Sequence, residues 1–154
     1  MPTWKYFALA MLAWPHLAGA ATPPAVQQAV DSFIAALNGT DPAPFAAAFA
    51  PQASITDTLG AFNWQGRDAA TRYFSALQAE LKADGWTSLQ LAPRGEETVM
   101  DKAGHAYAAV PLFVNYTVHG QKKQDQGIFT LTLAQSGKSW KITSATWTYT
   151  SPPG

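Results

Sequence analysis

The sequence contains no cysteine, and this absence excludes several classes of site. Without thiols the chain cannot form a disulfide, bind a metal through thiolates or use a cysteine nucleophile. A charge excess is also absent, because ten Lys and Arg residues balance ten Asp and Glu residues. No basic patch with interleaved aromatic residues is present, which argues against nucleic acid as a partner.

Long apolar runs are scarce, and the one near the start is too short to span a bilayer. It covers Tyr6–Trp14, follows Lys5, and is followed by the small-residue motif Ala-Gly-Ala that ends at residue 20. This order is typical of a secretory signal peptide. We therefore predict a signal peptide over residues 1–20 and an exported protein, periplasmic or secreted, with no membrane association after cleavage.

Residues 21–154 have the length and apolar content of a single domain with its own core. Helical spacing of apolar residues predicts three helices, and alternating or β-rich segments follow, so the fold class is α+β. The helices are expected over residues 22–38, from Asp41 through Phe49 to a stop at Pro51, and over residues 68–84. The strands are expected over residues 53–60, 86–91, 97–101, 107–119, 127–134 and 140–149.

Irregularities in the later strands predict how the sheet departs from a regular ladder. The apolar pattern changes parity between Ile142 and Ala145, which indicates a bulge or a sheet buried on both sides. Pro111 implies a bulge or an edge position, because proline cannot donate to the ladder. Turns or loops are expected over residues 60–66 and 120–126. A curved sheet that carries helices on one face fits this pattern.

The segment ASITDTLG, Ala53–Gly60, places an acidic side chain among apolar ones. In a strand, Asp57 shares a face with Ile55 and Leu59, because side chains alternate between the two faces. Such a carboxylate is either a structural group held by hydrogen bonds, or it lines a cavity as a base or polar anchor. Asp57 is therefore the candidate catalytic residue, with a structural role as the alternative.

Two segments carry a family resemblance. FAPQASITDTLGAFNWQGRDAATRYFSAL and GIFTLTLAQSGKSWKITSATWT, together with the order of elements, resemble the nuclear transport factor 2-like (SnoaL-like) superfamily. The resemblance implies N-terminal helices packed on a strongly curved mixed or antiparallel sheet that forms a cone. It implies no single activity, because this scaffold hosts isomerases, cyclases, dehydratases and binding modules.

Comparison with ketosteroid isomerase within that superfamily is specific enough to follow residue by residue. Asp57 matches the carboxylate that shuttles the proton. Phe33 occupies the position of the oxyanion-hole tyrosine, and the strand expected to hold a second acid offers Thr130 and Thr132 instead. Without those donors an oxyanion has no matching stabilisation, so the resemblance does not support steroid isomerisation.

Large rings are numerous, and they form either the core or the wall of an apolar ligand pocket. His105 and His119 lie beside turns without a third nitrogen ligand, so we expect no metal and no cofactor. The residues predicted to line a pocket are Phe33, Phe62, Trp64, Tyr73, Asn115 and Trp147.

Two classes of function remain open. In the first, the cone holds a small apolar or weakly polar molecule, with or without proton transfer by Asp57 as an isomerase or lyase. In the second, a non-catalytic module forms a homodimer through the sheet face that carries Phe113, Asn115 and Trp147, and side chains fill the cone. An open cavity beside Asp57 favours the first class and a filled cone the second. The sequence favours a binding pocket.

Overall fold

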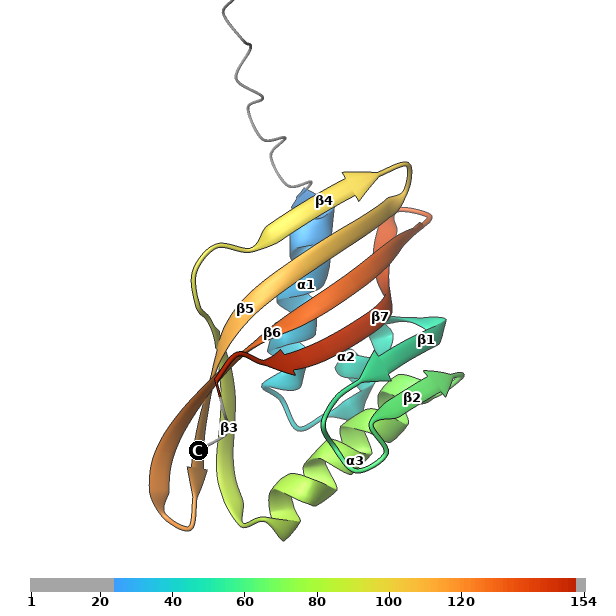
Figure 1. Ribbon diagram of the computed structural model, residues 1–154. Coiled ribbons are helices and arrows are strands. Elements are labelled where there is room, and N and C mark those ends of the chain that lie inside the picture. Colours follow the sequence, from blue (N-terminus) through green and yellow to red (C-terminus); the bar gives the residue numbers. More distant parts are fainter. Residues whose placement is uncertain (1–23, 152–154) are drawn as a thin grey trace, which may run out of the picture.

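The computed structural model describes residues 24–151, so the signal peptide predicted over residues 1–20 lies outside the described part. Three helices pack on a seven-stranded mixed sheet that curves around them, the predicted α+β architecture (Figure 1). The helices are α1 (Pro24–Leu37), α2 (Pro42–Ala47) and α3 (Ala69–Ala83). The strands are β1 (Phe49–Thr56), β2 (Asn63–Gly66), β3 (Trp86–Pro93), β4 (Thr98–Lys102), β5 (His105–Val118), β6 (Gln121–Ser136) and β7 (Ser139–Tyr149).

Helix α1 contacts the core through the apolar stripe that predicted it. Val26, Val30 and Phe33 are almost completely buried, as a spacing of three and four residues requires. After the helix, the Asn38 side chain accepts a hydrogen bond from the Leu91 backbone N–H at 2.7 Å and donates one to the Leu91 carbonyl at 3.0 Å. This pair of bonds fixes the end of α1 to β3.

The second helix is shorter than predicted and leads directly into a strand. The Asp41 side chain caps α2 by accepting a hydrogen bond at 2.9 Å from a backbone N–H two residues on. The helix ends at Ala47, and Phe49 opens β1 instead of extending the helix. Pro51 does not stop a helix. It lies in a stretch where the pairing of β1 with β7 shifts register, between Phe49 and Ser54.

The loop predicted over residues 60–66 contains a strand that the sequence did not indicate. Strand β2 pairs antiparallel with β1, and Trp64 lies opposite Ile55. Helix α3 then begins one residue after Asp68, which adopts a left-handed φ of 63° and makes no side-chain capping hydrogen bond. The helix start is therefore where the sequence placed it, but Asp68 does not act as a hydrogen-bonding cap.

The strand order is β2-β1-β7-β6-β5-β3, and β4 also pairs with β5. Strands β1 and β7 are parallel, whereas the other neighbours are antiparallel. Between β6 and β7 the register shifts, since Thr132 pairs with Ser144 and Leu133 with Ile142. This irregularity confirms the predicted change of parity, and it lets both Ile142 and Ala145 point into the core.

Strands β5 and β6 form a longer hairpin than predicted. Its turn consists of His119 and Gly120, whose φ angles of 49° and 77° are typical of a two-residue hairpin turn. The turn predicted over residues 120–126 is therefore wrong, and most of that segment belongs to β6. Pro111 lies between the part of β5 paired with β4 and the part paired with β3, which agrees with a local edge position.

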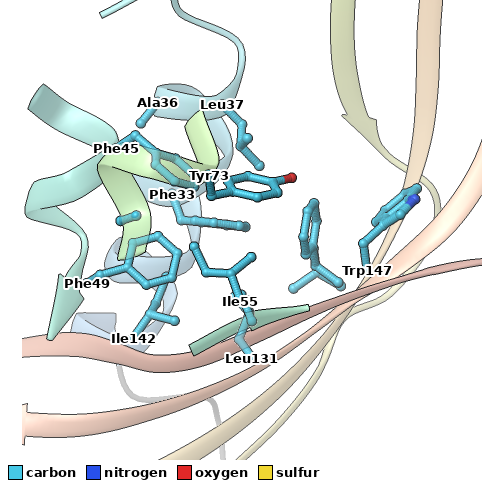
Figure 2. Close-up of a cluster of buried hydrophobic side chains, with 14 of the residues drawn as sticks. Phe33, Ala36, Leu37, Phe45, Phe49, Ile55, Tyr73, Leu131, Ile142 and Trp147 are labelled. Atoms are coloured by element: carbon cyan, nitrogen blue, oxygen red, sulfur yellow. The ribbon is translucent and has the colours of Figure 1, made fainter. Parts of the chain in front are cut away.

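Aromatic side chains from helices and sheet form the centre of the core. The ring of Phe33 lies 5.7 Å from that of Phe45 and 5.8 Å from that of Phe49, between ring centres. It also meets Phe129 of β6 edge-on at 5.1 Å. Figure 2 shows Tyr73 at the border of this cluster, with its hydroxyl pointing toward the side on which Trp147 lies. The cluster therefore fills one part of the cone and leaves the Tyr73 hydroxyl at its boundary.

Candidate functional site

A cavity of about 190 Å³ lies inside the cone beside the aromatic cluster. Its wall is mainly apolar and includes a few polar groups. Ligand pockets for drug-sized molecules typically measure roughly 300–1,000 Å³, so this cavity suits a more compact molecule. The lining residues are Leu37, Asp57, Thr58, Leu59, Tyr73, Leu77, Glu80, Leu81, Asp84, Trp86, Leu89, Leu91, Val114, Phe129, Trp147 and Tyr149.

Asp57 is the buried acid of this cavity, with 9% of its surface exposed. Asp57 directly follows β1 and lies on the side of the buried Ile55, as the alternation of strand side chains predicted. The Tyr73 hydroxyl donates a hydrogen bond to Oδ2 of Asp57 at 2.6 Å. Thr58 donates to Oδ1 through its backbone N–H at 2.5 Å and its hydroxyl at 3.2 Å. These donors stabilise a carboxylate, because hydrogen bonds to an ionised acceptor are short and strong.

Two phenols next to Asp57 keep their protons well beyond neutral pH. Burial, and then the nearby Asp57 carboxylate, raise the pKa of Tyr73 well above its ordinary value of 10.0. Burial also raises the pKa of Tyr149, while hydrogen bonding with Trp147 and Thr58 acts in the opposite direction. Both tyrosines are therefore neutral hydrogen-bonding groups at the cavity wall.

One face of helix α3 forms a wall of the cavity. The spacing of three or four residues between its members puts them on the same side of the helix. The Tyr73 ring packs edge-on against Trp64 of β2, with 5.2 Å between ring centres, and this contact fixes the direction of the hydroxyl. The members of this face are Tyr73, Leu77, Glu80 and Leu81, and Asp84, directly after the helix, continues the wall.

The sheet contributes a wall of aromatic rings. Trp147 packs against Phe129 with 4.8 Å between ring centres and meets Tyr149 edge-on at 5.5 Å. Gly127 leaves the room for this arrangement. A Cβ at Gly127 would overlap the Trp147 ring and would lie 2.7 Å from the Thr148 carbonyl oxygen. The position of Trp147 in the cavity wall therefore depends on a glycine in β6.

The structure brings three of the predicted site residues together at the cavity: Asp57, Tyr73 and Trp147. Phe33 lies instead within the aromatic cluster, because its stripe on α1 faces the centre of the sheet. Trp64 is buried behind the Tyr73 ring and does not contribute to the lining.

Two further predicted residues also lie away from the cavity. Phe62 is 63% exposed, in the turn between β1 and β2. Asn115 accepts a hydrogen bond from Gln124 on the outer face of the β5–β6 hairpin, opposite the buried Val114. Trp147 points inward, so it does not share the outer face with Asn115 as predicted for the dimer surface. Dimerisation and export remain predictions.

A second tyrosine–aspartate pair lies near the same end of the cone. The Tyr116 hydroxyl donates a hydrogen bond to Asp125 at 3.0 Å, and Asp125 is only 5% exposed. Burial, and then this hydrogen bond, raise the pKa of Tyr116 to about 12. Trp86, which lines the cavity, stacks on Tyr116 with ring centres 3.9 Å apart and planes at 10°. The pair therefore supports the cavity wall from behind.

The sequence interpretation found no acid on this strand because it began the strand at residue 127. Strand β6 begins at Gln121, so Asp125 lies on the same face as the buried Phe129. The polar run before residue 127 gave no indication of a strand. Glu80 was also missed, although its spacing from the inward-facing Tyr73 and Leu77 indicates the same helix face.

His105 and His119 lie at opposite ends of the long hairpin, outside the cavity lining. Among residues 24–151, no three His, Asp or Glu side chains gather in a group able to hold a metal ion. Within the same residues, no helix has both the length and the apolar character needed to cross a bilayer.

The helices and the curved sheet form the nuclear transport factor 2-like fold. The chain belongs to the SnoaL-like domain family, whose model matches residues 26–147. Among curated proteins, no match was found.

Solved structures with the same fold have diverse names. A candidate ketosteroid isomerase from Shewanella frigidimarina is 22% identical, covers 80% of this chain and 94% of its own, and has a TM-score of 0.66. A candidate scytalone dehydratase from Novosphingobium aromaticivorans is 14% identical, and the match covers 82% of this chain and 83% of that chain, with a TM-score of 0.67. An uncharacterised protein with a cystatin-like fold from Caulobacter vibrioides is 24% identical, and the match covers 83% of this chain and 89% of that chain, with a TM-score of 0.65. At these identities the likeness establishes the fold alone.

Proposed function

We propose that this domain binds a compact small molecule in the cavity beside Asp57. Apolar and aromatic side chains provide most of the contact, and the Asp57 carboxylate anchors one polar group of the ligand. The observation that carries the proposal is the buried hydrogen bond of 2.6 Å between Tyr73 and Asp57 at the wall of a cavity of about 190 Å³.

The free-energy cost of burying the Asp57 carboxylate favours a binding role for this residue. A buried carboxylate is costly unless donors compensate it, and an apolar side chain in its place would avoid that cost. The coincidence of an acid, oriented phenols and a largely apolar pocket at one place is typical of a binding site.

The alternative of a filled cone receives less support. It requires side chains to occupy the interior next to Asp57. Phe33 and Trp64 are buried outside the cavity lining, and Phe62 is mostly exposed, so none of these three rings fills that space.

A cavity-filling variant tests the proposal. Leu89 lines the cavity and is partly exposed, so Leu89→Trp introduces an indole that occupies the void. A set of compact aromatic and cyclic fragments is screened by ligand-observed NMR against the wild-type protein, Leu89→Trp and the control Met100→Trp, whose wild-type side chain is 60% exposed on β4. We expect fragments that bind the wild type and Met100→Trp but bind Leu89→Trp at least about tenfold more weakly. Equal binding to all three proteins places the ligands elsewhere.

A second candidate function is proton transfer on the bound molecule, with Asp57 as the base. The arrangement that favours it is a carboxylate adjacent to neutral phenols, because a phenol donates a hydrogen bond to an oxyanion that forms on proton removal. Tyr149 lines the cavity and is suited to that role, since burial raises its pKa. Loss of turnover in Asp57→Asn, with fragment binding retained, is the result expected for an enzyme.

A further inference from the structure

The charged groups of the cavity all have one sign. Three carboxylates line the cavity, those of Asp57, Glu80 and Asp84. Among residues 24–151, no Lys, Arg or His side chain belongs to the lining. Glu80 is half-buried and accepts a long hydrogen bond from the backbone N–H of Gly60, at 3.4 Å, while Asp84 is exposed at the C-terminal end of α3. The imidazole of His119 lies against Gly85, next to Asp84 in the chain, and stays outside the lining.

A cleft with charges of one sign between apolar walls concentrates its electric field inside, since low-dielectric walls screen it poorly. The C-terminal end of a helix adds partial negative charge, and Asp84, directly after α3, lines this cavity, whereas Lys82 in the last turn of α3 lies outside the lining. The charges of the lining therefore favour a negative potential inside. This potential opposes an anionic ligand and favours a cation.

Aromatic rings make up much of the remaining wall. Trp86, Trp147, Tyr149 and Phe129 all line the cavity. Aromatic faces attract organic ammonium groups, and they contact the apolar part of such a ligand at the same time. A bare metal ion gains nothing from such walls, and the carboxylates of residues 24–151 do not form a metal-binding group.

We infer that the ligand of this cavity is a compact organic cation, an amine protonated at neutral pH that carries an apolar or aromatic body. The inference rests on the proposed binding function and specifies the charge of its ligand. The ammonium group lies on the side of Glu80 and Asp84 or reaches Asp57, and the apolar body contacts Trp86 and Trp147.

Three probes of nearly equal shape test the charge preference: benzylamine, benzyl alcohol and benzoate. Each is titrated into the full chain at neutral pH and low salt, and binding is followed by isothermal calorimetry and tryptophan fluorescence. We expect benzylamine to bind at least about tenfold more tightly than benzyl alcohol, as one ammonium among carboxylates and rings requires. Benzoate is expected to bind most weakly of the three.

Variants locate the source of the preference. Glu80→Gln combined with Asp84→Asn removes two charges from the lining and leaves its shape, so the preference for benzylamine should fall severalfold. The control is Glu96→Gln combined with Asp101→Asn, which removes two exposed charges outside the lining and should leave the preference unchanged. An equal fall in both double variants assigns the preference to net charge and overturns the inference.

The outcomes separate this inference from the function on which it rests. If benzyl alcohol or benzoate binds in the cavity as tightly as benzylamine, the binding function stands and the cationic ligand is wrong. If none of the three probes binds, and the fragment screen with Leu89→Trp also finds no ligand for the cavity, the binding function itself fails.

Discussion

Replacement of Tyr73 by phenylalanine removes one hydroxyl and keeps the ring. In the structure that hydroxyl donates to Oδ2 of Asp57 at 2.6 Å, and the ring packs against Trp64 and Phe45. Hydrogen bonds to charged groups contribute about 1.5–3 kcal/mol, and loss of one donor leaves the buried carboxylate less well solvated. We therefore expect Tyr73→Phe to lower the free energy of unfolding by about 1.5–3 kcal/mol.

The assay is urea unfolding at neutral pH, followed by circular dichroism. The midpoint should fall while the slope with denaturant stays constant, which indicates a change of stability alone. Tyr107→Phe is the matched control, because Tyr107 is 36% exposed, and surface changes usually stay within about 0.5 kcal/mol.

A double-mutant cycle with Asp57→Asn assigns the loss to the pair. If the hydroxyl acts through Asp57, Tyr73→Phe costs clearly less in the Asp57→Asn background than in the wild type, and the coupling energy is roughly 1 kcal/mol or more. A loss no larger than that of Tyr107→Phe, or a coupling energy near zero, would show that the Tyr73 hydroxyl does not stabilise the Asp57 carboxylate.

Two further predictions concern the tyrosines and the glycine of the cavity wall. Because the pKa of Tyr73 is well above 10.0 and that of Tyr116 is about 12 in the folded state, the unfolded state releases their protons first, so stability is fully present below about pH 10 and falls as pH rises further. Each tyrosine that stays protonated lowers the free energy of unfolding by at most about 1.4 kcal/mol per pH unit. Urea unfolding at several pH values between about pH 9 and pH 12 should therefore show that this free energy falls less steeply with pH for Tyr73→Phe than for the wild type. An equally steep fall in both proteins would contradict the burial of a neutral phenol. Gly127→Ala should lower the free energy of unfolding by about 1–3 kcal/mol through displacement of the Trp147 ring, whereas Gly60→Ala, with no atom within 4 Å of the added Cβ, should change it little. Thermal unfolding of both alanine variants measures this difference, and an unchanged Gly127→Ala protein would show that Trp147 does not depend on the glycine.

Local patterns predicted the parts of the fold that depend on side-chain periodicity. The alternation in ASITDTLG placed Asp57 on the buried face with Ile55, and the stripe on α3 placed Tyr73 inward. The change of parity between Ile142 and Ala145 predicted the irregular pairing of β6 with β7. Each of these features follows from geometry within one element.

The contacts between elements were not predictable in the same way. Tyr73 and Asp57 are 16 residues apart, and only the packing of α3 against β1 brings their side chains together. Strand β6 extends through a polar segment because pairing with β5 outweighs the low strand propensity of lysine and glutamine. The polar pattern therefore did not predict that Asp125 belongs to the strand. Phe49 was predicted to be helical for a similar reason. Its local pattern fits a helix, but its place in the sheet makes it the first residue of β1.

Binding of a molecule inside the cone, beside Asp57, can be seen directly in a crystal structure of the protein soaked with the tightest-binding fragment of the screen. We expect electron density for the fragment in the cavity between α3 and the sheet, in contact with Trp147 and Tyr149 and with a polar atom within hydrogen-bond distance of an acid of the lining. Density only in a second pocket, which Trp140 and Lys141 line, or an empty cavity at saturating fragment, would show that the proposed site is wrong.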